Sequence, residues 1–430
     1  MLYENVSKIF KNETALRPEY IPETLPFRDA HLNRLEHYFS EFIENPGSVC
    51  PKVILVGKTG TGKTVTARKF GQSVETRGKN RKVRYIHVSC FIHRKLFSLL
   101  RDIGQQLGLP VPKRGLSVSD LIQLLLDLME ERDLYSVITL DDVFHLVNSS
   151  DEDEDQLGSL IKLSEEVYYR CGKYRFCFIL ISQDTSFLDR LDRSARSILG
   201  NVVIEFEPYT REQIYKILEQ RAELALREGT YSEDVLQMIA DVAGVDEDDL
   251  SRNSSYRGDA RFAIDVLWHA AKIAELDHAE KILPDHVREA LKHAVPGVPR
   301  EYIENLPLHK KLLLLAIVRA LKMRRSEAYV SFGFVEEVYG MICEQYGEKP
   351  RRHTQLWEYL RDLRSLGIIE TRLSGKGRRG RTTLISLSRD LRAEEHIDDM
   401  SRRISVSIPA EPLENLERLL EELIKRELGE

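Results

Sequence analysis

One eight-residue segment constrains this chain more than any other. The apolar run Val53–Val56 leads directly into Gly57–Thr64, with the sequence GKTGTGKT, and a helical pattern follows. This fits GxxxxGK[ST] between a strand and a helix. The glycines let backbone N–H groups turn inward around phosphate oxygens, and the helix N-terminus adds a partial positive charge. The predicted nucleotide-binding residues are Gly57, Lys58, Thr59, Gly60, Thr61, Gly62, Lys63, Thr64 and Val65.

Within this segment two side chains have specific predicted roles. The ammonium of Lys63 would reach the β- and γ-phosphates of ATP or ADP, and the Thr64 hydroxyl would ligate Mg²⁺. The surrounding sequence alternates apolar runs with amphipathic helical patterns, which predicts an α/β fold with a parallel sheet covered on both faces. The expected strands are Val53–Val56, Val83–Val88, Ser136–Leu140, Phe176–Ile181 and Val202–Phe206. From Tyr209 to about Ala294 the pattern is helical only.

Further predicted site residues follow these strands. After the strand that ends at Leu140, Asp141 would hold Mg²⁺ and Asp142 would polarise the attacking water. After the strand that ends at Ile181, Gln183 or its neighbour Ser182 would sense the γ-phosphate. In the helical region, Arg261 of the segment Gly-Asp-Ala-Arg lies at a helix start, from which an arginine could reach the nucleotide.

Composition divides the 430 residues into an acidic body and a basic module. The net charge is −6, but residues 300–390 hold 18 Lys and Arg against 11 Asp and Glu, a net of +7 that leaves −13 elsewhere. This asymmetry favours an anionic polymer as partner. The five scattered cysteines form no CxxC pair, which argues against a zinc ribbon or a disulfide framework. The lack of a long apolar run predicts a soluble, intracellular protein with no membrane partner.

The basic module reads as three helices followed by a hairpin. The helices are expected at Leu308–Lys322, Phe334–Tyr346 and Thr354–Leu366, and the hairpin strands at Ile368–Leu373 and Thr382–Leu387. The hairpin tip carries four cations and three glycines, which suits contact with phosphates. The predicted DNA-binding residues are Arg351, Arg352, Arg361, Arg364, Lys376, Arg378, Arg379 and Arg381. Near the C-terminus, Leu413–Ile424 forms an apolar stripe that predicts either a docked amphipathic helix or a helix for a partner or self-association.

Taken in order, these motifs resemble an AAA+ ATPase, and more narrowly the archaeal origin-recognition and cell-division-control replication initiators. The more specific matches are Ile21–Arg28 (IPETLPFR) and Leu306–His309 (LPLH). The resemblance implies an AAA+ P-loop parallel sheet with an all-helical lid, followed by a winged-helix domain. The implied domains are a nucleotide-binding base (1–208), the lid (209–295), the winged helix (296–390) and a tail with an amphipathic helix (391–430).

The resemblance also implies a function. Members of the family bind ATP or ADP with Mg²⁺ between base and lid, grip double-stranded origin DNA with the winged helix, and help to load the replicative minichromosome maintenance helicase. Carried over, Arg28 lies near the adenine and Arg261 is the second sensor. A cytoplasmic, nucleoid-associated protein that is monomeric or weakly self-associating is expected.

Several positions depart from the family pattern. Asp142 stands where the family usually has Glu, Gln183 where it has Asn, and Ser194 where an arginine is usual, although Arg196 is close by and remains a candidate catalytic residue. These changes predict tight nucleotide binding with slow hydrolysis, hence a weak ATPase used as a switch, in a divergent paralogue. Five consecutive carboxylates at Asp151–Asp155 would repel phosphate at a place where the family touches duplex DNA.

Two other functions fit parts of the pattern. A signalling-type NTPase would use the winged helix to bind protein. An AAA+ DNA motor would need vigorous hydrolysis, against which Asp142, Gln183 and Ser194 argue.

Overall fold

The computed structural model forms two compact units, Glu19–Pro208 and a second made of Met1–Pro18 with Tyr209–Glu430. The structure describes residues 7–78, 82–93, 95–112, 115–147, 156–245, 258–293, 303–324, 329–366, 368–373, 383–387 and 410–428. Within these residues, no helix has the length and apolar character needed to span a membrane.

The unit Glu19–Pro208 is built on a parallel sheet with strand order β2-β3-β4-β1-β5. The strands are β1 (Lys52–Val56), β2 (Val83–Ser89), β3 (Tyr135–Asp141), β4 (Phe176–Ser182) and β5 (Val203–Glu205). They coincide with the predicted strands to within two residues at either end, which confirms the α/β fold class. The helices are α1 (Asp29–Glu44), α2 (Lys63–Gly78), α3 (Leu96–Gln106), α4 (Val118–Glu131), α5 (Phe144–Val147), α6 (Gln156–Cys171) and α7 (Arg193–Leu199).

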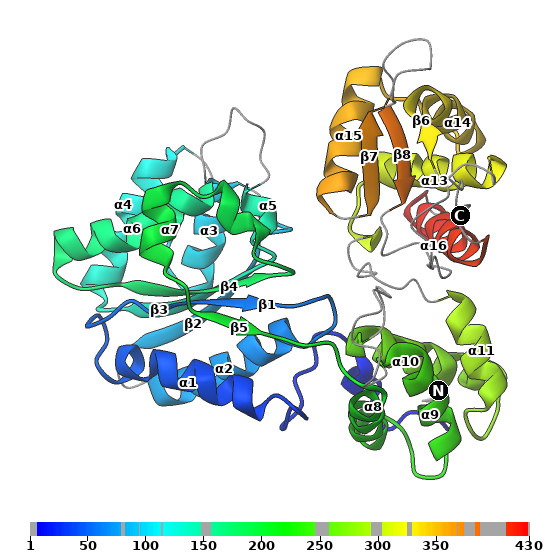
Figure 1. The fold of residues 1–430 in the computed structure, drawn as a ribbon, viewed down its shortest axis with the longest axis horizontal. Coiled ribbons are helices and arrows are strands. Elements are labelled where there is room, and N and C mark those ends of the chain that lie inside the picture. Colours follow the sequence, from blue (N-terminus) through cyan, green and yellow to red (C-terminus); the bar gives the residue numbers. More distant parts are fainter. Residues whose placement is uncertain are drawn as a thin grey trace, which may run out of the picture. The chain divides into compact units, whose positions relative to one another are not determined.

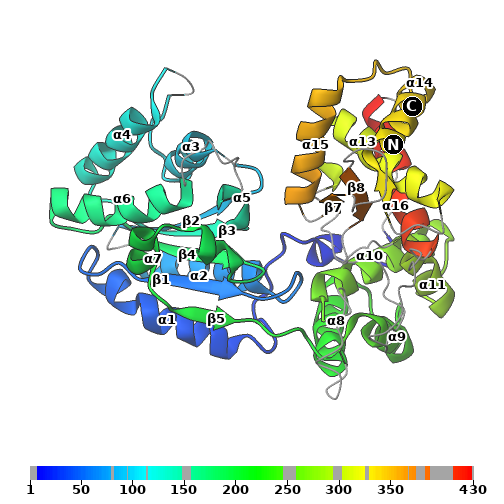
Figure 2. The same cartoon turned by 45° about the horizontal axis from the view of Figure 1, so that its top comes forward.

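Both faces of this sheet are covered by helices (Figure 1; Figure 2), and every residue of β1, β3 and β4 is buried. On one face, Phe39 of α1 and Phe70 of α2 pack with Val53 and Leu55 of β1. On the other, side chains of α3, α4 and α6 pack with alternate residues of the same strands, such as Ile54. Because both faces are apolar, the central strands read as continuous rather than alternating hydrophobic runs.

The second unit begins with a helical lid. Its helices are α8 (Arg211–Ala225), α9 (Glu233–Ala243), α10 (Ala260–Leu276) and α11 (Pro284–His293). A capping box begins α8, because Thr210 Oγ1 accepts from the Gln213 N–H and the Gln213 side chain accepts from the Thr210 N–H. Asp259 caps α10 in a related way, by accepting from the Phe262 N–H at 2.9 Å.

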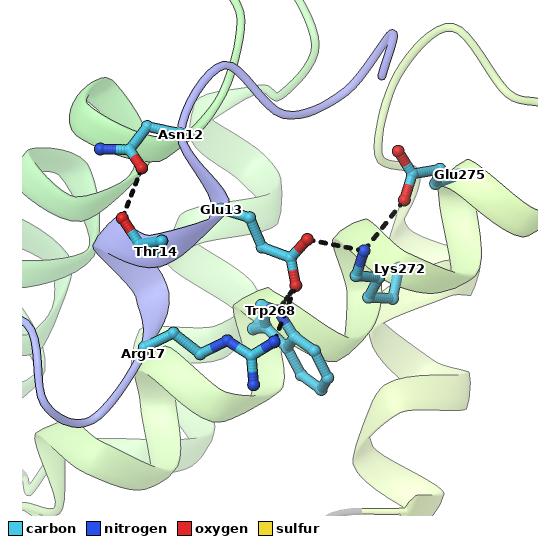
Figure 3. Close-up of polar contacts among 7 residues, drawn as sticks. All are labelled: Asn12, Glu13, Thr14, Arg17, Trp268, Lys272 and Glu275. Carbon is cyan, nitrogen blue, oxygen red and sulfur yellow. Dashed lines mark hydrogen bonds and ion pairs between the residues drawn. The ribbon is translucent and has the colours of Figure 1, made fainter. Parts of the chain in front are cut away.

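An N-terminal segment, residues 7–18, packs on the lid helices α8 and α10 (Figure 3), although the sequence analysis grouped it with the base. The side chains of Ile9, Phe10 and Leu16 are buried. The backbone of residues 9–12 pairs with residues 225–227. This apolar burial and backbone pairing explain why the segment belongs with the lid.

A carboxylate fastens the same segment to α10. Glu13, in the short helix η1 (Glu13–Leu16), accepts from the indole of Trp268 at 3.0 Å and from Lys272 at 2.8 Å. Arg17 pairs with the same carboxylate and lies over the Trp268 ring, as Figure 3 shows. Burial raises the pKa of Glu13, but the Lys272 and Trp268 hydrogen bonds outweigh it and hold that pKa below its ordinary value.

A winged-helix arrangement follows the lid, with a small sheet of order β6-β8-β7. Its elements are α13 (Leu308–Met323), β6 (Val330–Ser331), α14 (Phe332–Gln345), α15 (His353–Ser365), β7 (Ile369–Leu373) and β8 (Thr383–Leu387). The predicted three helices and antiparallel hairpin are thus confirmed. The hairpin tip with Lys376, Arg378, Arg379 and Arg381, and the acidic run 151–155, lie outside the described residues.

The C-terminal helix α16 (Ala410–Leu428) is docked on α13 (Figure 1), as the first of the two alternatives anticipated. The apolar residues of its stripe are buried, and Leu416, Leu420 and Ile424 are fully so. Flanking ion pairs fix the helix in place. Arg319 binds Glu417 and Glu421, Lys322 also binds Glu417, and Lys311 binds Glu427.

If α16 is part of the winged-helix core, Leu420→Ala will destabilise the protein by about 2–5 kcal/mol, the usual cost of truncating a buried leucine. Chemical unfolding followed by circular dichroism measures this. The exposed neighbour Glu422 supplies the control, and Glu422→Ala should change stability by less than about 0.5 kcal/mol. Equal, small effects of both substitutions would contradict a core role for α16.

Candidate nucleotide site and winged-helix surface

The P-loop is held in its cradle shape by glycines and by its own lysine. Gly60 and Gly62 have φ of +73° and +88°, in the left-handed region that favours glycine. A Cβ at Gly57 would lie 2.4 Å from the Phe206 carbonyl oxygen, so no larger residue fits there. The Lys63 ammonium is buried and donates to the carbonyls of Gly57 and Lys58 at 2.6 and 2.7 Å. The amine therefore lies inside the loop, where the motif requires it.

Arg28 is a buried clamp on this loop. Its Nε and Nη2 both donate to the Thr61 carbonyl oxygen, at 3.1 and 2.7 Å. Nη2 also donates to the Glu207 carbonyl oxygen at 3.3 Å, and the guanidinium lies over the Phe206 ring at 5.3 Å. The structure thus assigns Arg28 contacts with the protein backbone at the P-loop, while its predicted place near the adenine stays a prediction.

Thr64 and Asp141, the two predicted Mg²⁺ residues, are brought together. Thr64 Oγ1 donates to Asp141 Oδ2 at 2.9 Å. His87 Nε2 lies 3.1 Å from the same oxygen. Burial raises the pKa of Asp141, but the hydrogen bonds from His87 and Thr64 and the charge of Lys63 outweigh it and hold that pKa below its ordinary value. The site therefore holds an ionised carboxylate beside the first turn of α2.

The other predicted site residues lie either just after strands that end at the same edge of the sheet or elsewhere on helices. Asp142 directly follows β3 and is half-buried, with φ of +59°. Gln183 directly follows β4; its side chain is exposed, and its carbonyl accepts from the Gly57 N–H at 3.2 Å. Arg196 lies exposed on α7, where it pairs with Asp189 at 3.4 Å. Arg261 lies in the first turn of α10, in the lid unit. The catalytic roles of these residues stay predictions.

Sequence reasoning missed His87. The residue lies on β2, which was predicted only as an apolar strand, yet its imidazole contacts the carboxylate of Asp141. A signal was present, because Tyr85, His87 and Ser89 carry polar groups at alternate positions of the strand and so share one face.

The four predicted DNA-binding arginines that lie within the described residues point outward. Arg351 and Arg352 precede α15, Arg361 and Arg364 lie on it, and all four are exposed. The opposite face of α15 is apolar, with Leu356, Leu360 and Leu363 buried. The sequence reasoning overlooked His353 at the start of the same helix, whose imidazole lies 2.9 Å from Glu336 and accepts from the Trp357 indole at 3.1 Å.

Comparison with known proteins agrees with this arrangement. Three family models match in succession: an AAA domain at residues 50–191, the Cdc6 AAA+ ATPase-type lid domain at 215–292, and the CDC6 C-terminal winged helix domain at 301–396. ORC1-type DNA replication protein 2 of Sulfurisphaera tokodaii is 37% identical over 388 residues, which cover 89% of this chain and 90% of that protein. The chain belongs to the ORC1/Cdc6 family of DNA replication proteins.

Other members of the ORC1/Cdc6 family show the same extent of similarity. ORC1-type DNA replication protein 2 of Saccharolobus solfataricus is 34% identical over 91% of this chain and 92% of its own length. Among solved structures, Cdc6p from Pyrobaculum aerophilum is 38% identical with a TM-score of 0.61, covering 98% of this chain and all of that one. The Aeropyrum pernix ORC1 protein, solved in complex with DNA, is 27% identical with a TM-score of 0.71, covering 98% of this chain and 97% of that one.

The clamp role of Arg28 generates a prediction for the base. Arg28→Met keeps the apolar bulk but removes the donors to the Thr61 and Glu207 carbonyls, so we expect a loss of about 2–3 kcal/mol in unfolding free energy and weaker nucleotide binding. Arg34→Met is the matched control, because the hydrogen bond from Arg34 to the Val203 carbonyl is exposed. Unfolding titrations and ADP binding measure both effects. If the two variants behave alike, Arg28 does not hold the loop.

Proposed function

We propose that this protein is an ATP/ADP-regulated replication initiator that binds origin duplex DNA and helps to recruit or load the replicative minichromosome maintenance helicase. The observation that carries the proposal is the presence, in one chain of this family, of a formed P-loop with the Thr64–Asp141 contact and of a winged helix with outward arginines. The DNA complex of the similar Aeropyrum pernix ORC1 protein supports it.

The nucleotide is ATP or ADP with Mg²⁺. The backbone of Gly57–Gly62 and the Lys63 ammonium would bind the phosphates, and Arg261 of the lid would add a positive charge. The donors at the Thr64–Asp141 contact are a hydroxyl and an ionised carboxylate, and oxygen ligands of this kind together with substrate phosphates are what Mg²⁺ prefers. Within the described residues there is no cluster of three or more His, Cys, Asp and Glu side chains suited to a metal, which fits an ion shared with phosphates.

Hydrolysis is slow because of the residues found at three positions of the site. Asp142 is one methylene shorter than Glu, so its carboxylate reaches less far toward an attacking water. Its φ of +59° is tolerated by Asp better than by most residues, which fits the residue found there. Gln183 replaces the usual sensor Asn, and Ser194 replaces the usual arginine. Arg196 forms an ion pair with Asp189. The protein would thus act as a switch that stays long in the ADP state.

DNA is bound by the winged helix. Helix α15 has the dimensions to enter a major groove about 12 Å wide. Arg351 and Arg352 lie at its start, and Arg361 and Arg364 lie along its exposed face. The four cations between residues 376 and 381 would contact phosphates from the hairpin. Phosphate contacts fix register, while side chains at the start of α15 would read base edges.

Phosphate binding by the hairpin can be tested through its salt dependence. Arg378, Arg379 and Arg381 changed together to Ala should lower the slope of log K against log salt by about 2–3, at about 0.9 per lost phosphate contact. The matched control removes three exposed cations of the base, Arg77, Lys82 and Arg84, and should leave the slope unchanged. An unaltered slope in the hairpin variant argues against the assignment. Failure of the wild-type protein to bind duplex favours the signalling-type NTPase.

Slow turnover is tested by steady-state ATP hydrolysis with and without duplex DNA. We expect a rate below about 1 s⁻¹, the lower end of the range for kinases, because Asp142 positions water poorly. Asp142→Asn should lower this rate further while ADP affinity holds. A vigorous rate stimulated by DNA would instead support an AAA+ motor.

A further inference from the structure

The hydrogen bond between His87 and Asp141 has no part in the function proposed so far. We propose that His87 is a positioning residue for the magnesium carboxylate, and that it sets how strongly nucleotide binding depends on Mg²⁺. The inference rests on the proposed nucleotide function of the same site. His87 would not touch the metal or the phosphates; it would act through Asp141.

Strand register brings the two side chains together. In the parallel ladder of β2 and β3, His87 pairs with Thr139 and Ser89 pairs with Asp141. Asp141 is therefore the diagonal neighbour of His87, two residues further along the adjacent strand and on the same face of the sheet. An imidazole spans this diagonal, and the observed Nε2–Oδ2 distance is 3.1 Å.

The imidazole has a hydrogen-bonding partner at each ring nitrogen. Asp141 is ionised and can only accept, so Nε2 of His87 must donate to it. The other nitrogen, Nδ1, lies 3.2 Å from the Tyr85 hydroxyl. Burial raises the pKa of that hydroxyl, so Tyr85 keeps its proton. Tyr85, His87 and Asp141 thus form one continuous chain of side-chain contacts.

The carboxylate is held from two sides at one oxygen. Thr64 Oγ1 and His87 Nε2 both approach Oδ2 of Asp141, at 2.9 and 3.1 Å. Two hydrogen bonds to one carboxylate oxygen also orient the other oxygen, because both oxygens lie in one rigid plane. The carboxylate would then face the ion without first losing rotational freedom, which is what partners behind a metal ligand achieve.

The far end of the chain is braced by the helix that carries Thr64. A Cβ added at Gly71 of α2 would lie 2.3–2.5 Å from three ring atoms of Tyr85, so the ring packs directly against the α2 backbone. The first turn of α2 contacts Asp141 through Thr64, and its third turn contacts Tyr85 at Gly71. Helix α2, Asp141, His87 and Tyr85 therefore form a closed ring of contacts within one unit.

The experiment is a titration of the purified full-length protein with a fluorescent ADP analogue, first in EDTA and then with increasing Mg²⁺. For His87→Leu we expect the Mg²⁺ concentration at half-effect to rise 10–100-fold, the usual loss when a partner behind a metal ligand is removed. Affinity in EDTA should stay within about twofold, because no phosphate contact is lost. His87→Gln keeps an N–H donor and should restore most of the Mg²⁺ response.

A matched control comes from another His–Asp pair of the same unit. His93 Nε2 lies 3.7 Å from Asp102 Oδ2, with similar exposure, and His93→Leu should leave the Mg²⁺ response unchanged. Equal Mg²⁺ responses of wild type, His87→Leu and His87→Gln would overturn the inference. So would an equal loss of affinity in EDTA and in Mg²⁺, which indicates a purely structural histidine. If wild type binds no nucleotide under either condition, the proposed function fails, and this inference fails with it.

Discussion

Parallel pairing of β1 with β4, and of β4 with β3, is the constraint on which the nucleotide site depends. Because parallel strands end at the same edge of a sheet, this order places the P-loop, the segment after β4 and the two aspartates at the end of β3 side by side. Backbone hydrogen bonds then join these loops, from Gly57 N–H to Gln183 and from Val143 N–H to Ile181. Side chains from distant parts of the sequence meet there because the strands do.

The sequence predicted the elements well and their mutual contacts less well. Strands such as β3 and β4 could be predicted because burial on both faces leaves a continuous apolar run. The motif predicted Lys63 and Thr64 because phosphate chemistry restricts those positions. Arg28 could not be understood in the same way, since its partners are backbone carbonyls 33 and 179 residues away, which carry no side-chain signature. His87 required the order of the strands, because only the adjacency of β2 and β3 makes Asp141 its neighbour.

Helix α13 shows the same limit in the winged helix. Its middle, Leu312–Val318, is apolar all round, which predicts a helix surrounded by protein. The sequence did not say what surrounds it. Part of the cover is α16, which begins about ninety residues after α13 ends and pairs its acidic side chains with Lys311, Arg319 and Lys322. Complementary charge on the two helices was visible beforehand, but their pairing was one of several possible arrangements.

The docking of residues 7–18 on α8 and α10 makes the lid discontinuous in the sequence. The chain leaves the lid near residue 18, forms the whole base, and returns at residue 209, so two covalent crossings join the two bodies. The lid is therefore not a severable fragment. A lid fragment that begins at Tyr209 would lack the N-terminal segment with Ile9, Phe10 and Leu16, and it would expose the surface that these residues cover.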